Sequence, residues 1–463
     1  MLDLNISVPA LRDEDGGIQS EFVAQVALAI AAGDAAALRA MVGELHESDL
    51  GALLESLAPD ERPRLVELLG LHFDFSALTE VDDTVREEIL EELEPKTVAE
   101  GVRELESDDA VAILESLPQE EQAEILRELP QPERVTLARS LEYPEESAGR
   151  RMQTDFIAVS PTWTVGQAID YMRETVELPD RFYELYVADE GQHFLGAVPL
   201  DRLLRSQRPV PVSELMEPER RRVRATEDQE EVARLFQRYD LVAAPVVDTE
   251  DRLVGVITFD DVADVIEEEA EEDIKALGGV THDEELSDSV WTIARGRFNW
   301  LLVNLATAFL ASSVLGLFEG QLQKMVALAV LAPIVASQGG NATTQTMTVA
   351  VRALATRDLT DANAWRVITR ELLVGLFNGL AFAFITGAVA YAWFRVPGLA
   401  FVIGLAMICN LLAAALGGIL IPLGLNQLKI DPAVASSPFV TTVTDVVGFF
   451  SFLSIATLWF GLR

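Results

Sequence analysis

The chain has 463 residues, a mean hydropathy of +0.22 and a formal net charge of −40. One globular domain does not combine these values, and only six of the 75 acidic residues, but ten of the 35 basic ones, lie beyond residue 290. We therefore expect a very acidic soluble portion joined to an apolar membrane portion. Such acidity repels phosphate, excludes nucleic acid as a partner and favours cations. The alternative is that the excess Asp and Glu only keep the domain soluble.

Cysteine and histidine offer little chemistry in this sequence. The single cysteine, Cys409, lies in an apolar segment, and the four histidines lack ligand spacing. No nucleophile–base pair, phosphate loop or zinc motif is present, which predicts that the protein is not an enzyme. Residues 1–20 are acidic and polar, so we expect a disordered N-terminus that is cytoplasmic and carries no cleaved signal peptide.

Residues 21–140 read as short amphipathic helices. Their ends repeat a Leu-Glu-x-Leu pattern, as in residues 54–57 and 114–117, and Pro118 and Pro130 follow at places where proline ends a helix. The pattern predicts an α-helical N-terminal domain with a superhelical stack of helices.

Residues 141–262 contain an internal repeat. Residues 187–198 align with residues 246–257, and each copy reads as a strand, an acidic turn and a strand ending in glycine and two apolar residues. An amphipathic helix precedes each copy. The repeat resembles a tandem pair of cystathionine-β-synthase (CBS) domains, an α+β regulatory module.

A connecting helix is expected over residues 263–290, continuing from the second repeat. Its acidic residues Asp261, Asp264, Glu268 and Glu272 are spaced three, four and four apart, so they share one helix face. Like charges at this spacing destabilise a helix by a few tenths of a kcal/mol per pair. A bound divalent cation would relieve this repulsion; the alternative is a solvated acidic face.

Residues 291–463 predict an all-α membrane domain with five transmembrane helices. The apolar segments cover about 298–318, 322–338, 372–394, 399–424 and 438–460. Most are long enough to cross roughly 30 Å of hydrocarbon, although the second is short. Basic residues cluster between the second and third segments and recur between the fourth and fifth, which places both loops on the cytoplasmic side.

Asp445 lies inside the last apolar segment. A carboxylate at membrane depth costs roughly 2.5–3.5 kcal/mol, so it should face water, a partner or a cation. The second segment runs into Gly339-Gly340-Asn341, where paired glycines predict that the backbone leaves helical geometry beside a cavity; the alternative is close helix packing. Asn341 and the Thr441 carbonyl would add neutral oxygens. This hard-cation chemistry suits hydrated Mg²⁺ and leaves Ca²⁺, Mn²⁺ and a proton relay open.

The combined motifs resemble the MgtE family of magnesium transporters or channels over about residues 25–463. The resemblance rests on Gly339-Gly340-Asn341-x-x-x-Gln345, on residues 352–357, on Asp431-Pro432-Ala433 and on residues 438–448. It implies a multi-pass homodimer in the lipid bilayer of the cell (inner) membrane, with cytoplasmic N-terminal and CBS domains and a connecting "plug" helix. It also implies a Mg²⁺ pathway along the dimer axis through Asp445, with Asn341 and Thr441 nearby and Asp431 near the cytoplasmic end.

The same resemblance implies that Mg²⁺ gates the pathway. Bound Mg²⁺ would bridge acidic cytosolic surfaces and hold the pore shut. The matching positions are Asp109, Asp228, Glu230, Asp240, Asp261, Asp264, Glu269, Glu272 and Asp273. The sequence departs from the family pattern after Asp109, where Ala112 or Ile113 replaces an expected acid. This departure predicts weaker inhibition, or inhibition that needs more Mg²⁺.

A nucleotide site is also expected in the CBS pair. Thr258 followed by Asp261 fits the pattern in which the acid binds the ribose of ATP, whereas the first copy has Pro199 and Arg202 at these positions. The alternative is that Thr258 and Asp261 cap the next helix. The leading functional hypothesis is passive, Mg²⁺-gated Mg²⁺ entry. A cation exchanger coupled to protons or sodium, and a membrane-anchored CBS nucleotide sensor, are the alternatives.

Overall fold

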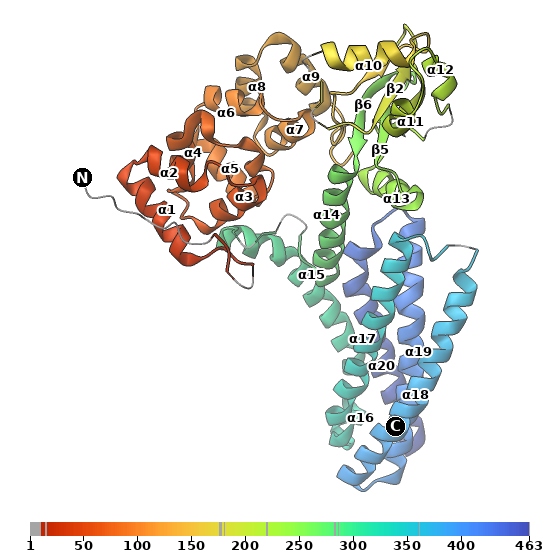
Figure 1. Cartoon of the computed structure of the whole chain (residues 1–463). Helices are drawn as coiled ribbons and strands as arrows, with labels where there is room; N and C mark the ends of the chain where they lie inside the picture. Colours follow the sequence, from red (N-terminus) through yellow and green to blue (C-terminus); the bar gives the residue numbers. More distant parts are fainter. Residues whose placement is uncertain are drawn as a thin grey trace. The chain divides into compact units, whose positions relative to one another are not determined.

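The computed structural model of the chain divides into two compact units, Met1–Glu267 and Glu268–Arg463 (Figure 1). The described residues are 11–13, 16–175, 178–179, 181–218, 221–281, 284–285, 287–360 and 362–462, and the side chains of residues 434–437 are also outside the description. Most of the expected disordered segment, residues 1–10 and 14–15, lies outside these ranges. Within it, Arg12 forms a β-bridge with Ile18 and an ion pair with Asp49, so this part has defined structure.

The N-terminal domain is entirely helical, as predicted. Its elements are α1 (Ser20–Ala32), α2 (Ala35–Val42), α3 (Glu47–Ser56), α4 (Arg62–Leu69), η1 (Gly70–His72), η2 (Phe75–Leu78), α5 (Asp83–Glu92), α6 (Pro95–Val102), α7 (Ser107–Glu115), α8 (Gln119–Glu128) and α9 (Gln131–Leu141). The leucines of the repeated Leu-Glu-x-Leu ends, such as Leu54, Leu57, Leu114 and Leu117, are buried in one continuous core. Short helices stay folded here because each buries this apolar end against its neighbours.

The CBS pair contains two three-stranded sheets, which confirms the internal repeat. The first sheet has the order β1 (Ala158–Val159), β2 (Glu184–Ala188) and β3 (Phe194–Pro199), and the second has the order β4 (Val223–Arg224), β5 (Ala243–Val247) and β6 (Leu253–Thr258). In both sheets the first pair is parallel and the second is antiparallel. The helices of the pair are α10 (Val165–Glu174), α11 (Leu200–Leu204), α12 (Val212–Leu215) and α13 (Gln229–Tyr239).

The connecting helix α14 spans Phe259–Gly278, so it begins earlier and ends earlier than the expected segment of residues 263–290. It starts directly after β6, because Asp261 accepts hydrogen bonds from the backbone nitrogen and hydroxyl of Thr258 and fixes the first turn. It ends at Gly279, whose φ of 73° suits glycine and stops the helix.

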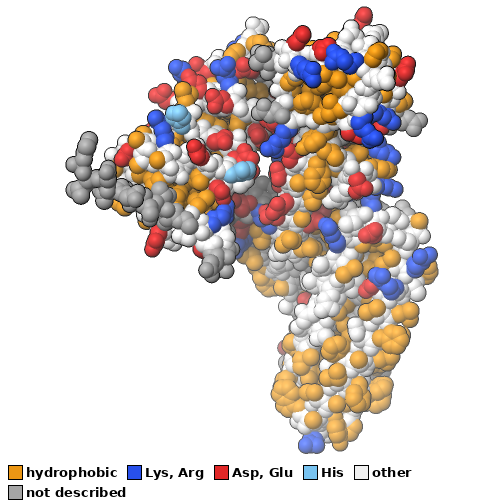
Figure 2. Space-filling model, viewed as in Figure 1, with side chains coloured by type: hydrophobic (Ala, Val, Ile, Leu, Met, Phe, Trp, Pro, Cys, Tyr) orange, Lys and Arg blue, Asp and Glu red, His pale blue; other side chains and the backbone are white. Residues whose placement is uncertain are grey.

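Among its described residues, the membrane domain contains five helices long and apolar enough to span a bilayer. These are α15 (Val290–Gly316), α17 (Val326–Ala355), α18 (Ala364–Phe394), α19 (Pro397–Gln427) and the Pro438–Phe460 part of α20 (Pro432–Phe460); the short α16 (Glu319–Lys324) precedes α17. Helix α19 is the most buried of them and packs against α17, α18 and α20. Hydrophobic side chains cover much of the visible face of the bundle, whereas acidic side chains gather over Met1–Glu267 (Figure 2).

The expected break of the second span at Gly339-Gly340 is wrong. Helix α17 runs for 30 residues without interruption, well past the predicted end at residue 338. Glycine inside a helix costs about 1 kcal/mol relative to alanine. Here the missing side chain lets α19 approach closely, since a Cβ at Gly339 would overlap the side-chain amide of Asn410. The alternative considered for these glycines, close helix packing, therefore holds for Gly339.

Candidate ion pathway and acidic regulatory surfaces

Asp445 lies in the middle of α20, the last spanning helix, and is half-buried in the single chain. Among the described residues it forms no ion pair with Lys or Arg. Gly448, one turn further along α20, lies against Ala336 of α17, because a Cβ at Gly448 would be 3.4 Å from the Ala336 Cα atom. The turn of α20 that carries the carboxylate is therefore next to the polar part of α17.

Helix α17 carries a polar stripe along one face. The stripe consists of Ser337, Asn341, Thr344, Gln345 and Thr348, which follow one another at helical spacing and are all exposed in the single chain. The hydroxyls of Thr344 and Thr348 donate to the carbonyls of Gly340 and Thr344, so their oxygens remain able to accept. Lipid tails offer no partners to such a face, which therefore must meet water or another protein surface.

The other expected pathway residues also lie on α20. Asp431 caps its N-terminus and accepts a 2.8 Å hydrogen bond from the backbone nitrogen of Ala433. The Thr441 carbonyl accepts a 2.9 Å hydrogen bond from the Thr444 hydroxyl, and the Thr441 hydroxyl donates to Pro438. One side of the Thr441 carbonyl is thus already occupied by Thr444.

The C-terminal end of α14 lies against the two helices that carry these residues. Ala276 packs in one buried cluster with Met347 and Val351 of α17 and with Ala433 and Val440 of α20. The side chain of Lys275 forms a 2.7 Å ion pair with Glu285, which lies beyond the end of the helix. A shift of this end of α14 would therefore change the packing of α17 against α20.

Within the first unit, acidic residues from two helix N-termini meet. Asp108 and Asp109 lie in the first turn of α7, and Asp261 lies in the first turn of α14. Asp108 is buried, and the Oδ1 atom of its carboxyl group has no hydrogen-bond partner among the described residues. We call Asp108, Asp109, Asp261 and Asp264 the α7–α14 acidic contact.

Burial and mutual repulsion raise the pKa values in this contact. Burial, followed by the nearby Asp261 carboxylate, raises the pKa of Asp108 well above its usual range. Burial and the charges of Asp261 and Glu106 raise the pKa of Asp109 to about 7. Burial also raises the pKa of Asp261, although hydrogen bonds from Asp108 and Thr258 oppose this. The contact therefore favours protonated carboxyl groups over charged ones.

Sequence reasoning missed Asp108 and Glu106 in this region. Glu106 binds the side chain of Gln153, and the hydroxyl of Ser107 accepts a 2.7 Å hydrogen bond from the backbone nitrogen of Thr154. These bonds dock the start of α7 on the CBS pair. The available signal was the run Ser107-Asp108-Asp109 at a helix start, where acids are favoured by the helix dipole, but the sequence does not show what faces it.

The remaining expected metal ligands are spread over separate surfaces. Asp228 caps α13, Asp240 ends it in a left-handed conformation, and Glu230 pairs with Arg234. Glu269, Glu272 and Asp273 are partly buried along α14. In the described part of this single chain, no three or more Asp, Glu, His or Cys residues are arranged to hold a metal ion.

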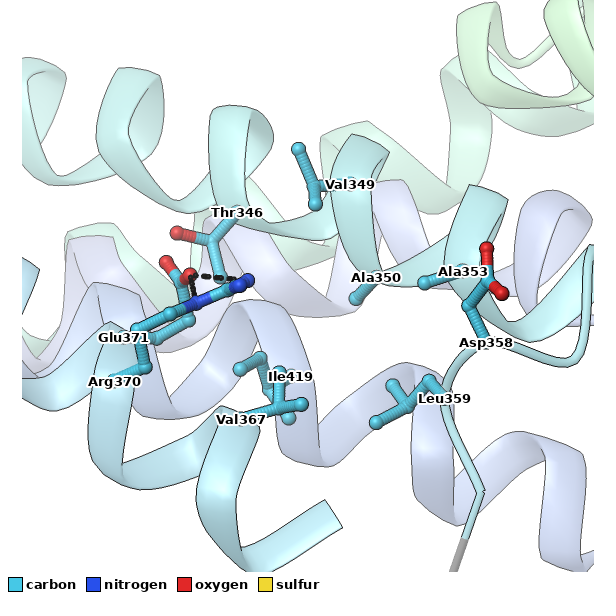
Figure 3. A pocket seen from close by; sticks show the side chains of 10 residues that line it. All are labelled: Thr346, Val349, Ala350, Ala353, Asp358, Leu359, Val367, Arg370, Glu371 and Ile419. Atoms are coloured by element: carbon cyan, nitrogen blue, oxygen red, sulfur yellow. Dashed lines mark hydrogen bonds and ion pairs between the residues drawn. The ribbon is translucent and has the colours of Figure 1, made fainter. Parts of the chain in front are cut away.

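The structure has a pocket in the membrane domain and another in the CBS pair. One, of about 140 Å³, lies between α17, α18 and α19 and contains the ion pair of Arg370 and Glu371 (Figure 3). None of the expected pathway residues lines it. The other, of about 550 Å³, lies in the CBS pair beside Arg202 and Tyr239, and the guanidinium of Arg221 stacks 3.4 Å from the centre of the Tyr239 ring.

Thr258 and Asp261 form a helix cap, as the alternative reading proposed. Asp261 Oδ2 accepts a 3.0 Å bond from the Thr258 nitrogen and a 2.7 Å bond from its hydroxyl. The same carboxyl group also forms a hydrogen bond with the side chain of Asp108. Binding of ATP ribose by Asp261 therefore stays a prediction, and it would have to compete with both contacts.

A helical domain, a CBS pair and five helices long and apolar enough to span a membrane, the last of which carries Asp445, fit a membrane transporter for cations. Comparison with known families agrees. Residues 332–455 match the family described as a divalent cation transporter, MgtE; residues 45–146 match the MgtE intracellular N domain; and residues 148–208 and 212–268 match CBS domains.

The chain belongs to the MgtE family of magnesium transporters, so it is a transport protein and not an enzyme. It is 38% identical to the magnesium transporter MgtE of Thermus thermophilus over 316 residues, which cover 68% of this chain and 70% of the relative. It is 34% identical to that of Enterococcus faecalis over 314 residues, covering 68% and 69% of the two chains.

Two solved structures each match about half of this chain. The cytosolic domain of the Mg²⁺ channel MgtE in complex with ATP is 32% identical, with a TM-score of 0.48, and the match covers 52% of this chain and 99% of that structure. The soluble part of a magnesium transporter is 27% identical, also with a TM-score of 0.48, covering 54% and 98%.

Proposed function

We propose that this protein is a homodimeric channel for Mg²⁺ in the cell (inner) membrane, with its N-terminal and CBS domains in the cytoplasm. The observation that carries the proposal is Asp445 in a spanning helix beside the exposed polar stripe of α17. Neither feature is stable against lipid. A second copy facing the first would enclose both stripes in a water-filled path.

The chemistry of this path favours a hydrated divalent cation. Each chain offers one carboxylate, together with hydroxyl and amide oxygens from Thr344, Asn341 and Gln345. Mg²⁺ gives up its water reluctantly and is often held through that water by one or two carboxylates. Two Asp445 side chains, one from each copy, would attract such an ion without removing its hydration shell, so the ion can also leave.

We propose that cytosolic Mg²⁺ closes the path through the acidic surfaces. At neutral pH the α7–α14 acidic contact holds carboxyl groups that repel one another, and a cation between them favours docking of the N-terminal domain. Helix α14 starts in this contact, and its end packs on α17 and α20. Docking can therefore favour one packing of the two pathway helices over another. A pair of helices with two alternative packings is the two-state element that a switch requires.

Uptake by the full-length chain in vesicles tests the pathway. Removing the charge in Asp445→Asn should lower Mg²⁺ uptake by about a hundredfold or more, because the loss of a buried or pore-lining charge is worth several kcal/mol. Glu319→Gln is the matched control, since Glu319 is an exposed acid on α16. Wild-type uptake by Asp445→Asn would refute the assigned path.

The alternatives predict different flux. A cation exchanger predicts uptake that follows an imposed proton or sodium gradient, whereas the channel predicts uptake that depends only on the Mg²⁺ gradient and the membrane potential. A membrane-anchored nucleotide sensor predicts ATP binding without ion flux.

We infer that ATP, where it binds, uses the pocket beside Arg221 and Tyr239. Two guanidinium groups, of Arg202 and Arg221, suit phosphates, and the Tyr239 ring and Leu241 suit a base. Equilibrium binding to the full chain tests this inference: Arg221→Ala should weaken ATP binding more than Thr258→Ala. The reverse order would favour the motif at Thr258 and Asp261.

A further inference from the structure

Asn410 is a polar side chain in the centre of the membrane domain. It lies on α19, is fully buried, and is surrounded by helices α17 and α20. Its Nδ2 atom donates a 2.7 Å hydrogen bond to the Val335 carbonyl, but its Oδ1 atom has no hydrogen-bond partner among the described residues. A buried acceptor without a hydrogen-bond partner destabilises the folded protein and is uncommon in native structures, so it needs an explanation.

Two glycines make room for this amide. A Cβ at Gly339 of α17 would overlap the Nδ2 atom and lie 3.1 Å from Oδ1, and a Cβ at Gly448 of α20 would lie 2.9 Å from Nδ2. Gly339 lies two residues before Asn341, and Gly448 lies one turn beyond Asp445. One side chain of α19 thus touches both helices of the ion pathway at the level of their polar groups.

The amide matches the backbone of α17 at this point. In a continuous helix the Gly339 N–H donates to the Val335 carbonyl, and the Asn410 amide donates to that same carbonyl. If α17 bends here, the Val335 carbonyl keeps its bond to Nδ2, and the freed Gly339 N–H finds an acceptor in Oδ1. Glycine tolerates the bend because it lacks a side chain.

We propose that Asn410 is a positioning residue for the ion pathway, whose amide supports bending of α17 at Gly339 when the path opens. This proposal rests on the proposed channel function. It accounts for the partnerless Oδ1, which serves the bent backbone.

Packing alone is the competing explanation, and the chain offers a matched control. Thr343 on α17 is also fully buried and donates a 2.9 Å hydrogen bond to the Ala414 carbonyl of α19. The same pair of helices is therefore joined by a second hydrogen bond, in which the Asn410 amide takes no part. Thr343→Val and Asn410→Leu each remove a buried polar group while keeping the shape of the side chain.

The test is Mg²⁺ uptake per correctly folded full-length dimer, together with the cytosolic-side Mg²⁺ concentration that halves it. Asn410→Leu should lower uptake at low cytosolic Mg²⁺ about tenfold, the effect of one net hydrogen bond lost, and should shift half-inhibition to a lower Mg²⁺ concentration. Thr343→Val should change both by less than about twofold, since a bend at Gly339 does not use its bond. Equal effects of the two variants would overturn the proposal.

A double variant keeps the test decisive if Asn410→Leu folds poorly. In Asn410→Ala with Gly339→Ala, the new methyl group fills the space that the amide leaves, so thermal stability should recover relative to Asn410→Ala while uptake stays low. Recovery of uptake together with stability would show that Asn410 only fills space. If wild type lacks Asp445-dependent uptake, the channel function itself fails; wild-type uptake by Asn410→Leu defeats the Asn410 proposal alone.

Discussion

Asp445 and the α7–α14 acidic contact use carboxylates in opposite ways. Asp445 is the one acidic residue of the last apolar segment, residues 438–460. It is half-buried and forms no ion pair with any described basic residue. Asp108, Asp109 and Asp261 instead crowd together at two helix starts, where burial and repulsion raise their pKa values. A single charge attracts an ion and releases it, whereas crowded charges change their preferred arrangement when an ion or proton arrives. The first suits passage and the second suits sensing.

The acidic contact should depend strongly on pH when divalent cations are removed. Because the pKa of Asp109 is raised to about 7 in the docked state, docking is favoured below the ordinary Asp range and is lost as the pH rises through about 7. The melting temperature of the full-length chain in EDTA should therefore fall by several degrees between about pH 4 and about pH 7, the ordinary and the raised pKa of Asp109. Added Mg²⁺ should remove most of this fall at pH 8.

Asp109→Asn is the variant that sharpens this comparison, and Asp49→Asn is its control. Asn at position 109 cannot ionise, so the pH slope in EDTA should become shallower. Asp49 is also an N-domain acid, but it pairs with Arg12 and lies outside the acidic contact. An unchanged slope in Asp109→Asn, or an equal change in Asp49→Asn, would contradict the assignment of the pH dependence to this contact.

A smaller effect is expected where α14 meets the pathway helices. Ala276→Leu adds three carbons to the buried cluster with Met347 and Val440, and overpacking of this kind costs about 1–3 kcal/mol. The packed, closed arrangement should weaken, so that half-inhibition of uptake needs about tenfold more Mg²⁺. Ile274→Ala on the same helix is the control, since Ile274 is 71% exposed. A shift of equal size in the control would mean that α14 acts in another way.

Two glycines of α19 should change the stability of the membrane domain in opposite directions. A Cβ at Gly418 would lie 2.8 Å from the Thr346 Cβ atom and 2.9 Å from the Thr343 carbonyl oxygen, whereas a Cβ at Gly424 would have no neighbour within 4 Å. Gly418→Ala should therefore destabilise the domain by about 1–3 kcal/mol, and Gly424→Ala should stabilise it by up to about 1 kcal/mol. Thermal unfolding in detergent measures both, and a loss of stability in Gly424→Ala would contradict the packing.

Local patterns predicted the fold well because each is written in a short stretch of sequence. The repeat around residues 187–198 and 246–257, the helical N-terminal domain and the apolar spans all follow from spacing and hydropathy. The length and continuity of α17 did not, because glycine at position 339 permits either a break or a close contact. Asn410, which decides between them, lies on a helix distant in sequence.

The site shows the same division. Asp445 could be predicted because a charge stands out in an apolar segment, whatever surrounds it. Asp108 could not, because its raised pKa comes first from burial in the folded chain and then from the charge of Asp261, which lies more than 150 positions further along the sequence. The family pattern directed attention to Asp109 and to the missing acid at Ala112 or Ile113, whereas in the structure the acid before Asp109 is the more deeply buried one.

The most direct test of the account is a titration of Mg²⁺ uptake against cytosolic-side Mg²⁺, measured in one vesicle system for three proteins. For Asp445→Asn the account predicts negligible uptake at every Mg²⁺ concentration. For Asp108→Asn combined with Asp109→Asn it predicts the wild-type maximum with a displaced inhibition curve. Two results would contradict the account, in which Asp445 serves ion passage and the α7–α14 acidic contact serves sensing. One is an Asp445→Asn protein with wild-type maximal uptake and only a shifted inhibition curve. The other is a double variant without any Mg²⁺ uptake.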